Sequence, residues 1–165
     1  MDRDDLLAVL RHYFNEEVKG AWVYLGLGIL ALVAGVWLWR SQSAFRHACW
    51  PLALVALLQM SVGAVIVLRV PAQRAALEQD LAHQPAAFKA QESQRVAQLL
   101  DAFRFYKLTE IALVLVALGL ALFLPHNDIA RGWGFGLLLQ SVFLLSAGLV
   151  AELRAETYLD AIRRL

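Results

Sequence analysis

Two glutamines lie within long apolar stretches of the chain, in nearly the same local sequence. Gln59 lies in LLQMS (57–61) and Gln140 in LLQS (138–141), and each is followed closely by a serine, Ser61 or Ser141. An amide in hydrocarbon needs a hydrogen-bond partner, and such bonds between membrane helices contribute about 0.6–2 kcal/mol. We expect these four intramembrane polar residues to pair with one another across helices. The alternative is that they form a polar lining for a ligand or a path.

A second group of polar residues flanks the apolar stretches on one side. Glu110 is the most informative member, because its apolar stretch is short and draws the carboxylate toward the membrane edge, where ionisable groups are functional candidates. Arg69 or Arg154 can neutralise it, since buried charges normally pair. Structural ion pairs are therefore favoured over a functional site. The charges expected near one level are Glu16, Glu17, Lys19, Arg69, Lys107, Glu110, Glu152 and Arg154.

The other residues capable of chemistry form no catalytic, metal or cofactor motif. The four histidines are scattered along the chain and none lies in the middle of an apolar stretch. Asp80 and His83 have the i, i+3 spacing of a di-iron ligand pair, but the second such pair that this site needs is missing. The one cysteine, Cys49, excludes an internal disulfide and a CxxC redox pair. We expect no catalytic residue, no metal and no cofactor.

Composition places these residues in a membrane protein. Hydrophobic residues make up 60% of the 165 positions and charged residues only 18%, whereas soluble domains are about 45–50% apolar. About 20 apolar residues cross a bilayer as a helix, which predicts four spans at approximately 21–39, 48–68, 108–124 and 132–151. Membrane lipids are thus expected partners. The net charge of +1 argues against nucleic acid, which needs a basic face.

Each span is continued on one side of the membrane by an amphipathic segment. Apolar residues recur at helical spacing in residues 2–20, 70–84, 87–107 and 152–165. We expect these extensions to prolong the spans as helices. The fold is then an all-α integral membrane protein, an up-down-up-down four-helix bundle that forms a single domain over 1–165 and runs from lipid into water.

Two prolines and the pattern of charges refine this expectation. Pro85 should end the second long helix, and Pro71 should kink or break it at the membrane surface. The outward faces of the extensions mix charges of both signs, as in Glu92 and Arg95 or in Arg74 and Glu78. Helices that lie flat on a membrane usually carry Lys and Arg there instead, so a protruding bundle fits better.

Basic residues and tryptophans predict the orientation. The side with both termini and the long connection carries 12 of the 15 Lys and Arg residues, and the other side has Arg40, Arg46 and Arg131. The positive-inside rule then places both termini in the cytoplasm, for a multi-pass protein of the bacterial cytoplasmic (inner) membrane. Four tryptophans mark the opposite interface: Trp37, Trp39, Trp50 and Trp133.

The two halves of the chain resemble one another. LVAGVWLW (32–39) and LALVALLQMS (52–61) align with LVALGLALFL (115–124) and FGLLLQS (135–141), each pair across a short loop. This indicates a duplicated helical hairpin whose copies point the same way, unlike the inverted repeats of many transporters. Gln59 and Gln140 are then equivalent and are expected to meet near a pseudo-twofold axis.

The stretches 51–77 and 85–113 resemble a widespread set of small, uncharacterised bacterial membrane proteins. The resemblance implies a four-span protein of the bacterial inner membrane and emphasises Arg69, Lys107 and Glu110, but it implies no mechanism. The positions that carry it are Gln59, Gly63, Arg69, Gln73, Phe88, Glu92, Arg95, Val96, Phe103, Tyr106, Lys107 and Glu110.

Three classes of function fit these features. The favoured one is a non-enzymatic membrane protein that acts through protein–protein contact with another protein or a second copy, such as an immunity, accessory or assembly protein. A small oligomeric transporter or pore would use Gln59, Gln140 and Glu110 to line a path. A membrane enzyme or binder of a lipophilic ligand would need a cavity at the inner interface, lined by Arg69, Lys107 or Arg154.

Overall fold

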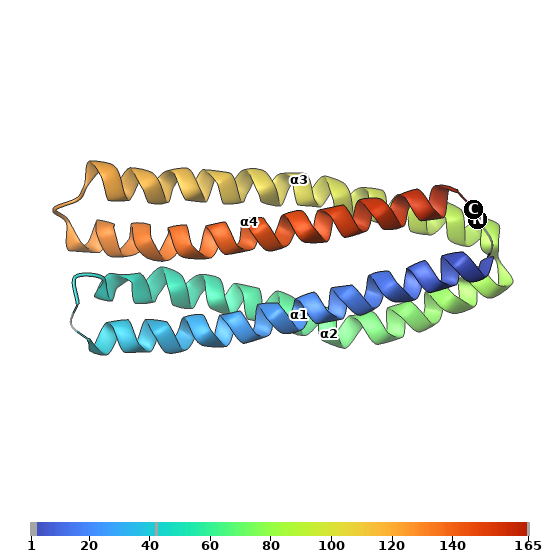
Figure 1. Cartoon of the computed structure of the whole chain (residues 1–165), viewed down its shortest axis with the longest axis horizontal. Helices are drawn as coiled ribbons and strands as arrows, with labels where there is room; N and C mark the ends of the chain where they lie inside the picture. Colours follow the sequence, from blue (N-terminus) through green and yellow to red (C-terminus); the bar gives the residue numbers. More distant parts are fainter. Residues whose placement is uncertain (1–2, 42, 165) are drawn as a thin grey trace.

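The computed structural model describes residues 3–41 and 43–164, which form four long helices and one short 3-10 helix (Figure 1). Successive long helices run in opposite directions, so the two ends of the described chain lie together. The predicted class, an all-helical up-down four-helix bundle, is confirmed. Its elements are α1 (Arg3–Arg40), η1 (Arg46–Ala48), α2 (Cys49–His83), α3 (Pro85–Phe123) and α4 (Asp128–Arg163).

Each long helix joins one predicted span to one predicted extension without interruption. By length and composition all four are able to cross a membrane. Where the bilayer would end on each helix stays a prediction, and residues 2 and 165, the outer limits of two extensions, lie outside the described residues. We call residues 21–68 and 108–151 the apolar half of the bundle. Residues 3–20, 70–107 and 152–164 form its extended half.

The helix ends follow from local sequence. Helix α2 ends at His83 and Pro85 opens α3, as predicted, because proline lacks an N–H but fits the first turn of a helix. At the other end of the bundle, the side chain of Asn127 caps α4 by accepting hydrogen bonds from the N–H groups of Ile129 and Ala130. These stops produce the short turns that an up-down bundle requires.

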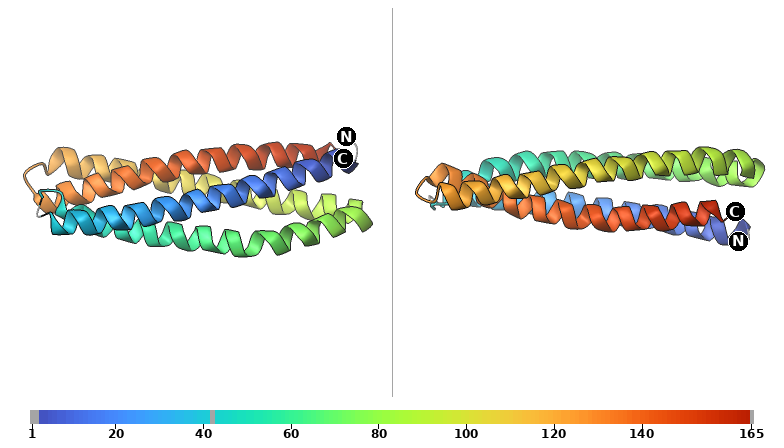
Figure 2. Two further views of the ribbon diagram at one scale, coloured as in Figure 1. Left: turned by 60° about the horizontal axis from the view of Figure 1, so that its bottom comes forward. Right: turned by 90° about the horizontal axis from the view of Figure 1, so that it is seen from above.

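Of the kink or break expected at Pro71, the break does not occur. Helix α2 continues through the proline and curves along its length instead (Figure 2). Val70, immediately before it, and Leu81, ten residues after it, are both buried in the bundle. Packing on both sides of Pro71 thus holds the helix together, although one backbone hydrogen bond is lost.

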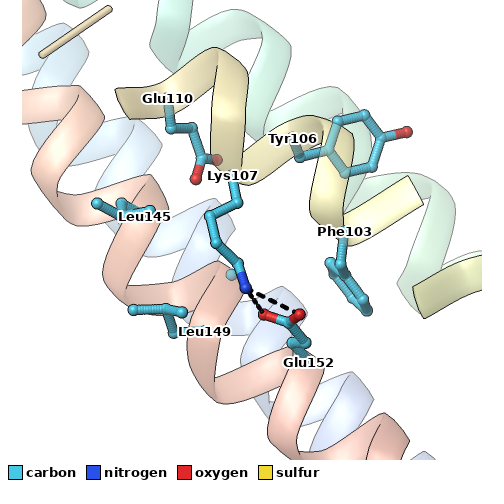
Figure 3. Close-up of a pocket in the computed structure, with 8 residues that line it drawn as sticks. Phe103, Tyr106, Lys107, Glu110, Leu145, Leu149 and Glu152 are labelled. Atoms are coloured by element: carbon cyan, nitrogen blue, oxygen red, sulfur yellow. Dashed lines mark hydrogen bonds and ion pairs between the residues drawn. The ribbon is translucent and has the colours of Figure 1, made fainter. Parts of the chain in front are cut away.

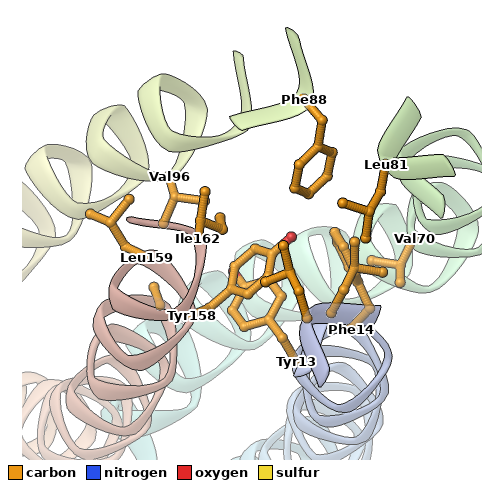
Figure 4. Packing of buried hydrophobic residues seen from close by; sticks show 12 residues of the cluster. Tyr13, Phe14, Val70, Leu81, Phe88, Val96, Tyr158, Leu159 and Ile162 are labelled. Carbon is orange, nitrogen blue, oxygen red and sulfur yellow. The ribbon is translucent and has the colours of Figure 1, made fainter. Parts of the chain in front are cut away.

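The hydrophobic core lies in the extended half (Figure 4). The rings of Tyr13 and Tyr158 stack with centroids 4.4 Å apart, and Phe14 meets Tyr158 edge-on. All four long helices contribute to this one cluster, so it ties the bundle together. Its members are Leu6, Leu10, Tyr13, Phe14, Val70, Leu81, Phe88, Val96, Ala155, Tyr158, Leu159 and Ile162.

The apolar half is packed through small residues and exposes its large ones. Ala21, Ala56 and Ala117 are buried there, whereas Leu122 and Phe123 are 71% and 84% exposed. Only 6% of the most apolar stretch of α3 is buried within the chain. Lipid covers such surfaces at no cost, so small residues that let backbones approach are what joins helices in a membrane.

Three glycines at the start of α4 show this close approach. A Cβ on Gly132 would lie 2.9 Å from the backbone nitrogen of Ala48 in η1, and one on Gly136 would lie 2.7 Å from Pro51 Cγ in α2. A Cβ on Gly134 would lie 2.8 Å from the carbonyl oxygen of Ala117 in α3. Helix α4 therefore contacts both α2 with η1 and α3, whereas the backbones of α1 and α3 do not approach each other closely among the described residues.

Replacing Gly136 with alanine should destabilise the protein, because the added methyl group would overlap Pro51 and Ala48. Overpacking of this kind costs about 1–3 kcal/mol. A matched control is Gly119→Ala on α3, where the Cβ meets nothing within 4 Å and the helix gains up to about 1 kcal/mol in propensity. In mild detergent, the melting temperature should fall for Gly136→Ala and rise for Gly119→Ala, relative to the wild type. Equal melting temperatures would contradict the close contact.

Candidate functional site

The predicted polar cluster contains one strong ion pair between α3 and α4 (Figure 3). Lys107 Nζ lies 2.6 Å from Glu152 Oε2 and donates a hydrogen bond of 2.9 Å to Glu152 Oε1. The two side chains are mostly buried between their helices, at 34% and 13% exposure. A partly buried pair of this geometry is screened less by solvent than an exposed one. It fixes the register of α3 against α4 at the junction of the two halves.

Glu110 lies one turn from Lys107 on α3 and shares its pocket (Figure 3). Its Oε2 faces Gly148 of α4, where a Cβ would lie 3.7 Å away. Glu110 forms no hydrogen bond or ion pair with the described residues, so the expected neutralisation by Arg69 or Arg154 does not occur. The cavity beside it measures about 10 Å³, room for roughly one water molecule.

Arg69 and Arg154 are engaged on the α1 side of the bundle instead. Arg69 Nη2 lies 3.4 Å from Glu17 Oε1, and Arg154 Nη1 donates a hydrogen bond of 2.6 Å to the carbonyl oxygen of Glu16. Lys19 pairs with the Glu16 side chain at 2.6 Å. Burial raises the pKa of Glu17 above its usual range, even though Arg69 opposes this. The expected cluster is therefore divided in two. Lys107 pairs with Glu152 between α3 and α4, whereas Arg69 and Arg154 bind residues of α1.

The two glutamines do not pair with each other. Gln59 Nε2 donates a hydrogen bond of 2.8 Å to the carbonyl oxygen of Tyr24 in α1. Gln140 Nε2 donates a longer one, 3.5 Å, to the carbonyl oxygen of Leu52 in α2. Both side chains are buried, and Gln59 Oε1 has no partner. Each amide thus joins two helices through a backbone carbonyl, and the expected side-chain pair is wrong.

The two serines do not pair with the glutamines, and the glutamines of the two halves have different kinds of partner helix. Ser61 Oγ donates to the carbonyl oxygen of Leu57 in its own helix, and Ser141 is buried. Gln59 binds the partner helix of its own hairpin, whereas Gln140 binds the other hairpin. The twofold relation expected for a duplicated hairpin therefore does not extend to the glutamines. Whether the halves arose by duplication stays a prediction.

The most buried charged residue among those the structure describes is Glu92, which was expected on a polar surface. Glu92 is 2% exposed in the core of the extended half. Its carboxylate accepts two hydrogen bonds of 2.7 Å from Arg95 and one of 3.1 Å from the Tyr158 hydroxyl. Spacing could have revealed it, because Glu92 is four residues from both Phe88 and Val96, which are buried on the same helix face.

This network joins three helices. Arg95 bridges from Glu92 toward α1, where its guanidinium lies 5.9 Å from the ring centre of Phe14. Burial lowers the pKa of Arg95, but the hydrogen bonds and charge of Glu92 outweigh it and raise the pKa above its ordinary value. Burial also raises the pKa of Tyr158, and it raises that of Tyr13 to about 12. The Glu92 carboxylate is therefore held by Arg95 and Tyr158 inside the core.

The described residues contain no group of three or more His, Cys, Asp and Glu side chains that could hold a metal ion. His47 instead packs on Gly132 and accepts a hydrogen bond of 3.2 Å from Arg46 Nε. Cys49 is buried at the start of α2. The fold and the site thus define an all-helical bundle of four potential membrane helices, with eight ion pairs among the described residues.

No family model, no curated protein and no solved structure matches this chain. The resemblance to small bacterial membrane proteins therefore stays a prediction.

Alkaline pH should destabilise the extended half through Tyr13. Its pKa in the folded protein is about 12, against about 10 when unfolded, so the unfolded chain loses the phenol proton first. The contribution of Tyr13 to the free energy of unfolding is intact below pH 10. It falls by about 2 kcal/mol as the pH rises to 12. Tyr13→Phe should show a smaller alkaline loss in detergent unfolding experiments than the wild type. Tyr106→Phe, at an exposed ring, is the control, and an unchanged loss in Tyr13→Phe would contradict the burial argument.

Proposed function

We propose that this chain is a non-enzymatic, multi-pass protein of the bacterial cytoplasmic membrane that acts through protein–protein contact. The observation that carries the proposal is the position of the hydrophobic core, which lies in the extended half and draws on all four long helices. Anchoring in lipid does not require a packed core outside the apolar stretches. A rigid body that projects from the membrane is suited to present a surface to another protein or to a second copy.

The surface of the extended half supports this proposal. Arg11 donates two hydrogen bonds of 3.0 Å to Glu78, and Arg74 donates one of 3.0 Å to Asn15, so α1 and α2 are clamped together there. Near its free end a surface hollow of about 270 Å³ lies beside Leu7, Arg11 and Leu81. A fixed surface with a hollow and mixed charges offers shape and charge complementarity to a partner protein.

The proposed orientation places the extended half in the cytoplasm. The extended half carries 12 Lys and Arg residues, whereas the opposite end carries three. The positive-inside rule associates the side with more basic residues with the cytoplasm. Both ends of the described chain lie at the end of the bundle that bears the core (Figure 1). A partner would then be met in the cytoplasm or at the inner membrane surface.

One observation favours a second candidate, a small oligomeric transporter. Glu110 is an acid at the edge of a predicted span without an ion pair among the described residues, and intramembrane acids often mark paths for ions or protons. The third class, a binder or enzyme for a lipophilic ligand, gains less support. The cavity beside Lys107 and Glu110 measures about 10 Å³, whereas ligand pockets usually measure 300–1,000 Å³.

Photo-crosslinking in cells tests the proposal. A photoreactive amino acid at Gln79 or Gln98, both exposed in the extended half, should give discrete adducts with one protein. The same group at Leu122, 71% exposed in a predicted span, is the control and should give mainly lipid adducts.

Absence of protein adducts from both extended positions would contradict the proposal. Proton or cation flux in proteoliposomes that Glu110→Gln abolishes would contradict it as well, and would support the transporter. The Glu110→Gln protein must keep its melting temperature for that comparison.

A further inference from the structure

The end of the bundle opposite the extended half carries a surplus of positive charge. The two short connections there, residues 40–47 and 125–131, contain three arginines and a single acid, Asp128. Asp128 is already engaged, because its Oδ1 accepts a hydrogen bond of 2.9 Å from Arg131 Nη2. Arg40 and Arg46 are exposed and form no ion pair with the described residues. Two positive charges therefore remain uncompensated.

Packing holds the arginine of α4 beside the η1 connection. The guanidinium of Arg131 lies 5.3 Å from the ring centre of Phe45, the residue immediately before Arg46. Phe45 in turn meets Phe135 of α4 at 5.2 Å. Arg131 Nε is buried and has no partner, so the guanidinium is only partly satisfied within the chain. The close contacts of Gly132 with His47 and Ala48 keep η1 and α4 together.

Arg46 is also oriented by its surroundings. Its Nε donates to His47 Nε2 at 3.2 Å, and the two Nη groups of this exposed side chain have no partner among the described residues. A guanidinium whose terminal donors are unused is well suited to an anionic oxygen group such as a phosphate.

Tryptophans identify the level at which these arginines would lie. Trp37, Trp39 and Trp50 are more than half exposed, and the rings of Trp39 and Trp50 meet at 5.9 Å. Exposed tryptophans gather at the headgroup level of a bilayer, and these three lie on the helical turns next to the connections. The uncompensated arginines are therefore placed where lipid phosphates are found.

We propose that the end of the bundle formed by Arg40, Arg46 and Arg131 binds the phosphate of an anionic phospholipid headgroup. Because two positive charges at this end are uncompensated, it favours a lipid with net negative charge. The positively charged amine of a zwitterionic lipid would be repelled by the arginines. The proposal depends on the four helices crossing a membrane and is independent of the protein-contact function, which concerns the other end.

Quenching of tryptophan fluorescence by brominated lipids tests the site, because four of the five tryptophans lie at this end. Wild-type protein in mixed vesicles should be quenched more by brominated phosphatidylglycerol than by brominated phosphatidylcholine at equal mole fraction. One basic residue at a membrane surface contributes a factor of about five in binding. Arg46→Gln should therefore reduce the preference for phosphatidylglycerol about five-fold, and Arg40→Gln should reduce it as well.

Arg164→Gln is the matched control, because Arg164 is exposed at the other end of the described chain, and it should retain the wild-type preference. Equal quenching of the wild type by both lipids would overturn the proposal, as would an unchanged preference in both Arg46→Gln and Arg40→Gln. Displacement of the lipid by inorganic phosphate, but not by chloride at the same ionic strength, would assign the site to a free anion and overturn the lipid as its ligand.

Discussion

A bilayer gives apolar side chains almost as good an environment as a protein core, so burial of leucine or valine cannot hold membrane helices together. The structure of this chain reflects that constraint. Its large apolar side chains between residues 21 and 68 and between 108 and 151 mostly face outward, and the buried positions there are mainly alanine and glycine. The helices are joined instead where water makes burial favourable, in the core built from Phe14, Phe88, Tyr158 and their neighbours.

The same contrast explains how polar groups are used in the two halves. In the apolar half, Gln59 and Gln140 reach backbone carbonyls of a neighbouring helix, because few side-chain partners exist there. In the extended half, Glu92 is withdrawn from water but receives three hydrogen bonds from Arg95 and Tyr158. A buried pair of this kind is weak evidence for stability, yet removing one partner typically costs about 3–5 kcal/mol. Its main consequence is to specify which faces of α1, α3 and α4 meet.

Much of this fold could be predicted from sequence, since hydropathy gives the number of helices and the amphipathic periodicity gives their length. The turn at Pro85 was also predicted, because a proline cannot continue the preceding helix. Side-chain partners were predicted poorly. Which residues meet depends on the arrangement of the helices around the bundle. Arg69 and Arg154 bind residues of α1 and not Glu110 of α3, which divides a cluster that one common membrane level had suggested. Glu92 was misplaced because its charge suggested solvent, although its spacing from Phe88 and Val96 suggested the core.

The extended half forms one shared core to which all four long helices contribute, and hydrogen exchange of the protein in lipid nanodiscs can show whether this core holds them together. Amides in lipid are protected in any case, but separate amphipathic helices in water are marginal and exchange rapidly. We expect slow exchange at residues 6–14, 88–96 and 155–162, and a loss of protection in all three segments together when Glu92 is replaced by alanine. Rapid exchange of these segments in the wild type, or a loss confined to α3 in Glu92→Ala, would contradict it.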